Sequence, residues 1–530
     1  MRPTASRKNG WRGAAVAIPW LAAIATTVAA TGSEDDFAQQ SREYEQRIAE
    51  QLAIDPGYPQ VLVEQFDYAK FLARQQEHCS ARLDKAEALR QQIEHNAAAA
   101  FAVPDAAARF AQLRYVIASG RADCTRNKAQ QQQWHEQART EALQAVELYR
   151  AQHDYIDAVV MQYNVAEQDR RAGNSDRARA ELLVALEMDE RYGLRDDAEE
   201  NLRYLGRWSG EPTSDVQVAE LMNRYADRTV VPAFHWNPGV SSGTFEMTRI
   251  RYAPIEPHRV TLRGRFRETV SAESDGLVDD MALLDIQSES AAGEKVPDTD
   301  AKLAVALTKI MGRLPATRLG RTGEFRGLLH AREYLDNMVT TLRDLPGEVL
   351  GADDPKREAA ERGLEQWLRT LGDESALTER MRSDYELYTG MWSDTALTRG
   401  EWRQRTATLE MPGAEQWRVE HDVSYEFAAW VPCTEGDGEA RCMELLVRAD
   451  PADDAVKNLR ERMAKTGNRK VAYWGTTHLR LVVDPRTLRP HVQERRQYAC
   501  IVYDNGKQHE VITTAKTTVF TVTSSGGGQP

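Results

Sequence analysis

The sequence predicts a multidomain α+β protein in which an N-terminal array of helices precedes an antiparallel β domain with a helical insertion. Three observations predict this class. Residues 34–208 are rich in helix-forming side chains and carry apolar residues at helical spacing. From residue 245 to about 524 apolar and polar residues alternate, except over about residues 328–392, where helical spacing returns. The length of 530 residues exceeds one ordinary core, which favours two or three domains.

Residues 1–30 have the layout of a secretory signal peptide. Basic side chains without any acidic one precede an uncharged run, and small residues near Ala30 suit cleavage. An uncleaved membrane anchor is the alternative, although the run is mostly alanine and contains Pro19. We expect an exported protein, periplasmic or envelope-associated in a bacterium, with no transmembrane span after signal cleavage.

The helical zone contains a hairpin motif at residues 159–206. In its first part, "VVMQYNVAEQDRRAGNSDRARAELLVALEMD", a turn at Gly173 separates two amphipathic segments. Small residues at Ala166, Ala178 and Ala185 would let two helices approach closely, and glycine permits the positive φ of a tight turn. The motif resembles the tetratricopeptide repeat (TPR), a two-helix unit that stacks into arrays. A plain helical bundle is the alternative.

This resemblance implies a groove lined by the first helix of each hairpin, which in the family receives peptides or helices from protein partners. Carried over residue by residue, it implies five partner-binding residues: Tyr163, Glu167, Arg170, Glu200 and Tyr204. Two alternatives remain open. The five side chains could be ordinary solvated surface, or the groove could pack on the chain's own β part.

The β part follows a breaker-rich linker at residues 209–244, spans residues 245–524, and ends in a flexible tail at residues 525–530. The phrases "VVDPRTLRP" and "LTRGEW" loosely resemble exported lipoprotein and carrier domains, in which a curved sheet wraps around a helix. That resemblance implies an apolar cavity for a lipid or a hydrophobic peptide. A filled core without a ligand is the alternative.

A hairpin with a disulfide is predicted near residue 437. Asp437 and Gly438 favour a two-residue turn and lie midway between Cys433 and Cys442. Counting outward places the two cysteines directly opposite each other at a non-hydrogen-bonded position, where facing side chains come closest. In an oxidising compartment we expect them to form a cross-strand disulfide.

A second disulfide is expected between Cys79 and Cys124. These cysteines occupy matching positions in two similar helical segments, and equivalent positions of stacked hairpins are neighbours. Cys500 then remains outside both disulfides. The alternative scheme joins Cys500 to Cys433 or Cys442, since a wider loop would shift the hairpin register.

The net charge and the absence of known catalytic motifs argue against several classes of function. A formal net charge of −13 argues against a general nucleic-acid binder. No metalloprotease, nucleophile-elbow, phosphate-loop or dinucleotide motif occurs, so we predict no catalytic residues, no cofactor and no metal site. The sequence therefore predicts an exported protein-binding scaffold with a TPR-like groove and a protein or peptide partner. A periplasmic carrier of an apolar small molecule or lipid is the alternative, and an enzyme without a recognisable motif is the second alternative.

Overall fold

The computed structural model places two compact units, residues 1–227 with 456–461 and residues 228–455 with 462–530. Each is described by itself. The residues that the structure describes are 34–55, 58–74, 79–95, 106–226, 229–252, 257–289, 314–349, 373–434, 440–465, 470–504 and 509–526, and positions 306, 310, 312, 357, 358, 361, 362, 364, 365 and 506. The predicted signal peptide lies outside them. The predicted α+β class is confirmed: helices come first and a large antiparallel sheet follows.

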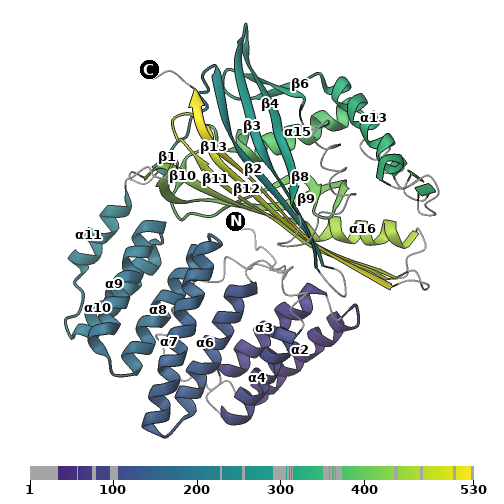
Figure 1. Ribbon diagram of the computed structural model, residues 1–530. Helices are drawn as coiled ribbons and strands as arrows, with labels where there is room; N and C mark the ends of the chain where they lie inside the picture. The colour runs from purple at the N-terminus through teal and green to yellow at the C-terminus, as the bar shows by residue number, and fades with distance from the viewer. Residues whose placement is uncertain are drawn as a thin grey trace, which may run out of the picture. The chain divides into compact units, whose positions relative to one another are not determined.

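The first unit is a row of helices that lie side by side in chain order (Figure 1). Polar side chains fix several starts; the Asn127 carboxamide, for example, accepts hydrogen bonds from the first backbone N–H groups of the following helix. The helices are α2 (Glu34–Leu52), α3 (Pro59–Ala73), α4 (Cys79–His95), α6 (Ala106–Cys124), α7 (Lys128–Ala151), α8 (Tyr155–Arg171), α9 (Ser175–Tyr192), α10 (Arg195–Ser209) and α11 (Asp215–Ala226).

The α8–α9 hairpin has the turn and the crossing that the sequence predicted. Gly173 adopts φ 83°, a left-handed conformation that favours glycine. A Cβ at this position would meet nothing within 4 Å, so the backbone conformation, and not a lack of space, explains the glycine. Ala166, Ala178 and Ala185 are at most 1 % exposed, and two of them share an apolar cluster with Leu182. The small side chains therefore mark the position where the two helices approach each other.

The connection from α9 to α10 is short, because α9 continues through Tyr192. Gly193 ends the helix in the left-handed region, at φ 76°, and α10 begins at Arg195. Residues 190–192 thus form nearly one further turn of helix, in which intrahelical hydrogen bonds satisfy their backbone groups.

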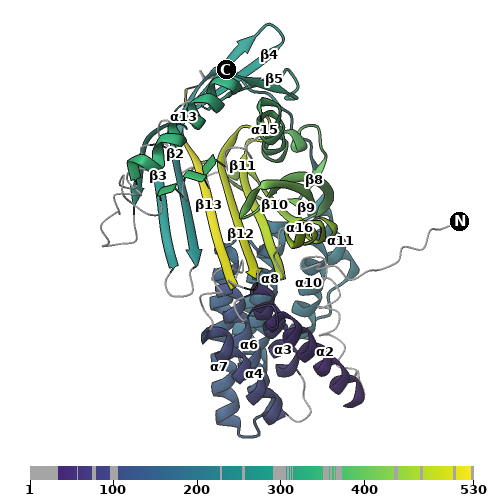
Figure 2. The same ribbon diagram turned by 90° about the vertical axis from the view of Figure 1, so that its right-hand side faces the viewer.

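Among its described residues, the second unit contains an antiparallel sheet of 11 strands, in the order β6-β5-β4-β3-β2-β13-β12-β11-β10-β9-β8. Figure 2 shows β2, β3 and β11–β13 side by side. A separate pair joins β1 (Thr229–Val230) to β7 (Leu397–Thr398). The large sheet is built from β2 (Gly239–Tyr252), β3 (Pro257–Glu273), β4 (Gly276–Glu289), β5 (Ala316–Gly320), β6 (Phe325–Leu329), β8 (Arg403–Met411), β9 (Ala414–Pro432), β10 (Ala440–Pro451), β11 (Lys470–Val483), β12 (Pro490–Asp504) and β13 (His509–Gly526).

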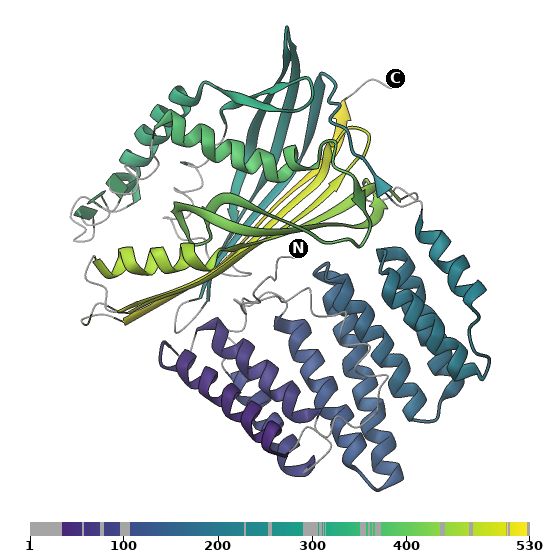
Figure 3. The same cartoon turned by 180° about the vertical axis from the view of Figure 1, so that it is seen from behind.

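One face of this sheet forms an apolar core. Alternate residues of β10 and β11, such as Leu445 and Leu481, are fully buried there. They share a cluster with Trp392, which donates its indole N–H to the Leu387 carbonyl at 3.1 Å. Trp392 lies in the short helix η1 (Gly390–Trp392) after α15 (Glu374–Tyr388). Helices α13 (Ala331–Val349) and α15 both lie on one side of the sheet, as Figure 3 shows.

Three details of the chain after residue 227 correct the sequence-based boundaries. Strand β2 begins at Gly239, inside the predicted linker, and β13 continues to Gly526, inside the predicted tail. Helix α16 (Asp453–Lys465) interrupts a region expected to be all strand. Its first turn carries two acids that favour a helix N-terminus, and that signal was missed. Within the described residues, no helix has the length and apolar character that crossing a membrane would require.

Candidate functional site on the first helices of the array

The first helices of three successive hairpins, α6, α8 and α10, lie next to one another. Gln168 on α8 donates to the Ser119 hydroxyl on α6 at 3.0 Å, and Arg171 forms an ion pair with Asp123 on α6 at 3.0 Å. On the other side, the rings of Tyr163 on α8 and Tyr204 on α10 have centroids 5.1 Å apart. We call this shared surface the first-helix face. It contains all five residues that the sequence predicted as partner-binding.

Aromatic rings and guanidinium groups gather where α8 meets α10. The Trp208 ring lies 6.3 Å from Tyr163 and 6.0 Å from Tyr204, between centroids. The Arg170 guanidinium stands over Trp208 at 5.6 Å, and that of Arg207 stands over Tyr204 at 4.2 Å. Such stacking fixes the direction of a guanidinium while leaving part of its edge for other groups.

Charges on this face are closely coupled. Glu167 accepts two hydrogen bonds from Arg170, both at 2.7 Å, and one from Arg171 at 2.8 Å. Burial acts to raise the pKa of Glu167, but these hydrogen bonds outweigh it and leave the pKa lowered. Burial, followed by the charges of Glu200 and Asp196, raises the pKa of Asp197 to about 6.

The exposure expected for the predicted residues is corrected by the structure. Tyr163 is only 3 % exposed, Tyr204 6 % and Glu167 7 %, so these three side chains pack between hairpins. Glu200 is partly exposed, while the Arg170 side chain is 45 % exposed. The family pattern identified which helix face these residues occupy. It could not show that aromatic side chains on adjacent first helices would bury each other.

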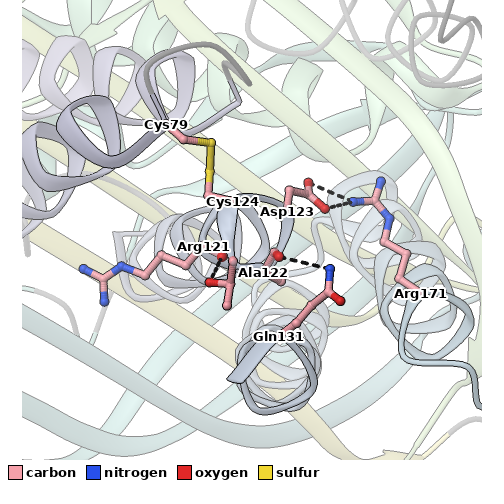
Figure 4. Close-up of a disulfide and its surroundings, with 8 residues drawn as sticks. Cys79, Arg121, Ala122, Asp123, Cys124, Gln131 and Arg171 are labelled. Carbon is pink, nitrogen blue, oxygen red and sulfur yellow. Dashed lines mark hydrogen bonds and ion pairs between the residues drawn. A yellow bond between two sulfur atoms is a disulfide. The ribbon is translucent and has the colours of Figure 1, made fainter. Parts of the chain in front are cut away.

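The Cys79–Cys124 disulfide is present and joins the start of α4 to the end of α6, with Cα atoms 5.9 Å apart. Its expected basis was wrong, because Cys79 begins a second helix whereas Cys124 ends a first helix, so the two positions are not equivalent. Figure 4 shows this disulfide beside the Asp123–Arg171 ion pair. The covalent bond therefore fixes the end of α6 that contributes to the first-helix face.

The Cys433–Cys442 disulfide is also present, with Cα atoms 5.0 Å apart. The predicted register is wrong. Cys442 pairs with Val431, because a register shift follows Ala440, and Cys433 lies in a bend after β9. The Asp437-Gly438 turn lies outside the described residues. Cys500 is buried, receives a hydrogen bond from the Thr513 hydroxyl and takes part in neither disulfide, which overturns the alternative scheme.

A buried polar cluster on the apolar face of the sheet was missed. Glu268 accepts hydrogen bonds from Ser241 at 2.6 Å and from Arg489 at 2.9 Å. Burial and the nearby charge of Glu268 raise the pKa of Asp279 strongly, although Arg489 opposes them. The sequence did contain an indication, since Glu268 interrupts the apolar alternation of Phe266 and Val270. An acid at such a position is expected to have a buried partner.

Comparisons with known proteins leave the function open. No protein-family model matches the sequence, and no curated protein matches it either. One similar solved structure is described as "Lipid-protein interactions in lipovitellin". It shares 9 % sequence identity at a TM-score of 0.28, and the similarity covers 56 % of this chain and 26 % of that chain. The chain thus spans about a quarter of that protein's length, and at this score the likeness carries no argument.

Proposed function

We propose that this protein is an exported, TPR-like scaffold whose first-helix face binds a protein partner through peptide segments that carry carboxylate side chains. One observation carries the proposal. The parallel first helices end in arginines, and those of α8 and α10 stand over aromatic rings on the same face. The whole chain is acidic, and these arginines place positive groups on this face, where ion pairs with Glu167 and Asp123 compensate part of their charge.

The chemistry of these arginines supports a carboxylate ligand. Arg170 uses Nε and one terminal nitrogen for Glu167, and a guanidinium has five N–H donors in total. Arg207 is exposed and stacked on Tyr204. Two oriented guanidiniums beside the partly exposed Trp208 ring could form bidentate hydrogen bonds with acidic side chains and pack an apolar neighbour on the indole.

Export is part of the same proposal. The basic, then uncharged, N-terminal segment has the layout of a secretory signal. The two disulfides support an oxidising compartment, since disulfides are rare where thiols are kept reduced. A partner in the periplasm or cell envelope is consistent with both observations.

The carrier alternative receives less support from the described part of the sheet. Phe245, Phe266 and Phe520 form an aromatic cluster on the apolar face. A Cβ added at Gly243 would meet the Phe266 ring at 2.5 Å, and one at Gly264 would meet the Phe245 ring at 2.6 Å. Because the rings fill the space above these glycines, an apolar ligand would have to displace side chains there.

Binding to an immobilised library of random peptides tests the proposal. The wild-type chain should enrich acid-rich peptides, and the double variant R170A/R207A should lose the enrichment at least tenfold. The matched control R179A/R191A removes two exposed arginines of α9 and so makes the same change in charge. Equal enrichment by the two double variants, or none by the wild type, would contradict the proposed function.

A further inference from the structure

Three side chains that can bind metals meet at one end of β9, β10 and β12. The Sγ atoms of Cys433 and Cys442 and a ring nitrogen of His491 all lie within 4.8 Å of one another. The cysteines are joined as a disulfide. Cys442 is fully buried in its strand, whereas Cys433, in the bend that follows β9, is partly exposed.

Backbone irregularities bring these residues together. The β11–β12 ladder pairs Val482 with Val492 but Val483 with Pro490, so His491 is the additional residue of a β-bulge. Bulges redirect side chains out of the regular alternation. On the other strand, the register shift before Cys442 leaves Cys433 beyond the last paired residue of β9. Two separate departures from regular pairing thus converge on one point.

We propose that Cys433, Cys442 and His491 form a redox-controlled metal site: the disulfide is the closed state, and reduction opens a two-thiolate, one-imidazole site for Zn²⁺ or a similar thiophilic ion. This inference does not rest on the proposed peptide binding. Thiolate and imidazole are the ligands that such ions prefer. Around a tetrahedral zinc, with Zn–S bonds of about 2.3 Å, two sulfurs lie about 3.8 Å apart, a separation that the 5.0 Å between the Cα atoms permits.

The reaction balances with an external dithiol as reductant. A thiolate of the reductant attacks the more exposed sulfur, that of Cys433, and Cys442 leaves as a thiolate. The second thiol of the reductant then releases Cys433 and becomes the reductant's own disulfide, so two electrons pass to the protein. Binding of the metal ion to both sulfurs displaces their protons. The donor set leaves a fourth coordination position for water or an external ligand.

The second disulfide provides an internal comparison. Cys79 and Cys124 are also joined, but among the described residues they belong to no group of three potential ligands at this spacing. Reduction exposes four thiols in total at the two disulfides. Only the pair beside His491 should then bind a metal tightly.

Cobalt(II) titration of the full chain tests the site, because thiolate ligands give cobalt an intense charge-transfer band. The chain is reduced with a phosphine, which itself becomes the phosphine oxide, and far-UV circular dichroism checks that it stays folded. The reduced wild type and C79S/C124S should bind one cobalt with this band, displaced by zinc. The oxidised chain and reduced C433S/C442S should not. H491A should weaken binding at least tenfold, whereas H330A, at an exposed histidine, should not change it.

Alkylation mapped by mass spectrometry provides a second measurement. Zinc should protect Cys433 and Cys442 of the reduced chain but leave Cys79 and Cys124 reactive. A thiolate band retained in C433S/C442S, equal affinity in H491A and wild type, or unfolding on reduction of the 433–442 disulfide in C79S/C124S would each overturn the proposal.

Discussion

The rings of Tyr163 on α8 and Tyr204 on α10 pack against each other across two hairpins, tilted by 42° with centroids 5.1 Å apart, and both side chains are almost fully buried. Y163A should lower the free energy of unfolding by about 3–5 kcal/mol, because it removes a buried ring and leaves a cavity between first helices. Y163F keeps the ring and should cost less than about 1.5 kcal/mol. Urea unfolding followed by circular dichroism measures both. Equal midpoints for Y163A and wild type would show that the packing of the two rings contributes nothing to stability.

The crossing of α8 and α9 should not tolerate a larger side chain. A178L adds three carbons at a position that is 1 % exposed and should destabilise the array by about 1–3 kcal/mol. A180L, two residues later on the exposed side of the same helix, is the matched control and should stay within about 0.5 kcal/mol of wild type. The same urea experiment separates them. If A180L were as destabilising as A178L, the crossing would not be the cause.

The two disulfides should differ in their contributions. In the chain-entropy model, the bond that closes 45 residues between Cys79 and Cys124 contributes about 4 kcal/mol, and the one that closes nine residues contributes about 3 kcal/mol. C79S/C124S should therefore lower stability more than C433S/C442S does. Guanidinium unfolding of both double variants tests the order. If C433S/C442S lowered stability more, the length of the closed loop would not be the main determinant of each disulfide's contribution.

Glu426 should make stability depend on pH. Burial and then the charge of Glu444 raise its pKa to about 8 in the folded chain. The folded state thus binds a proton that the unfolded state has already released, so stability falls as pH rises from the unfolded pKa through about 8, by up to about 1.4 kcal/mol per pH unit. E426Q should remove this component, and E420Q, at an exposed acid of the same strand, should keep it. Urea midpoints measured from pH 5 to 9 compare the variants; parallel curves for E426Q and wild type would refute the assignment.

The sequence predicted most of what local patterns determine. The turn at Gly173 and the alanine crossing follow from spacing and residue size, and the structure has both of them. The change from helical to alternating spacing correctly separated the array from the sheet. These features depend on residues close in sequence, where periodicity carries the information.

Features that depend on distant residues could not be predicted in the same way. Tyr163 is buried because a ring from the next hairpin packs against it. Cys442 lies opposite Val431 because of a register shift, and counting residues outward from the turn assumes regular pairing and so misses such a shift. The partner of Glu268 is Arg489, which lies far along the chain on the connection between β11 and β12. For the first-helix face, the hairpin motif in the sequence indicated which helices form the face. It did not indicate which side chains on them remain exposed to solvent.

Strands β2 and β13 are neighbours in the middle of the sheet, with Phe245 opposite Phe520, although about half of the chain separates them. During synthesis, β2 leaves the ribosome long before β13, so the two halves of the sheet cannot join until the residues between these strands have been translated. Contacts this distant also slow folding, because a long loop must close first. Until β13 is made, the inner edge of β2 stays unpaired, and a chaperone that covers this edge would protect the nascent chain from aggregation.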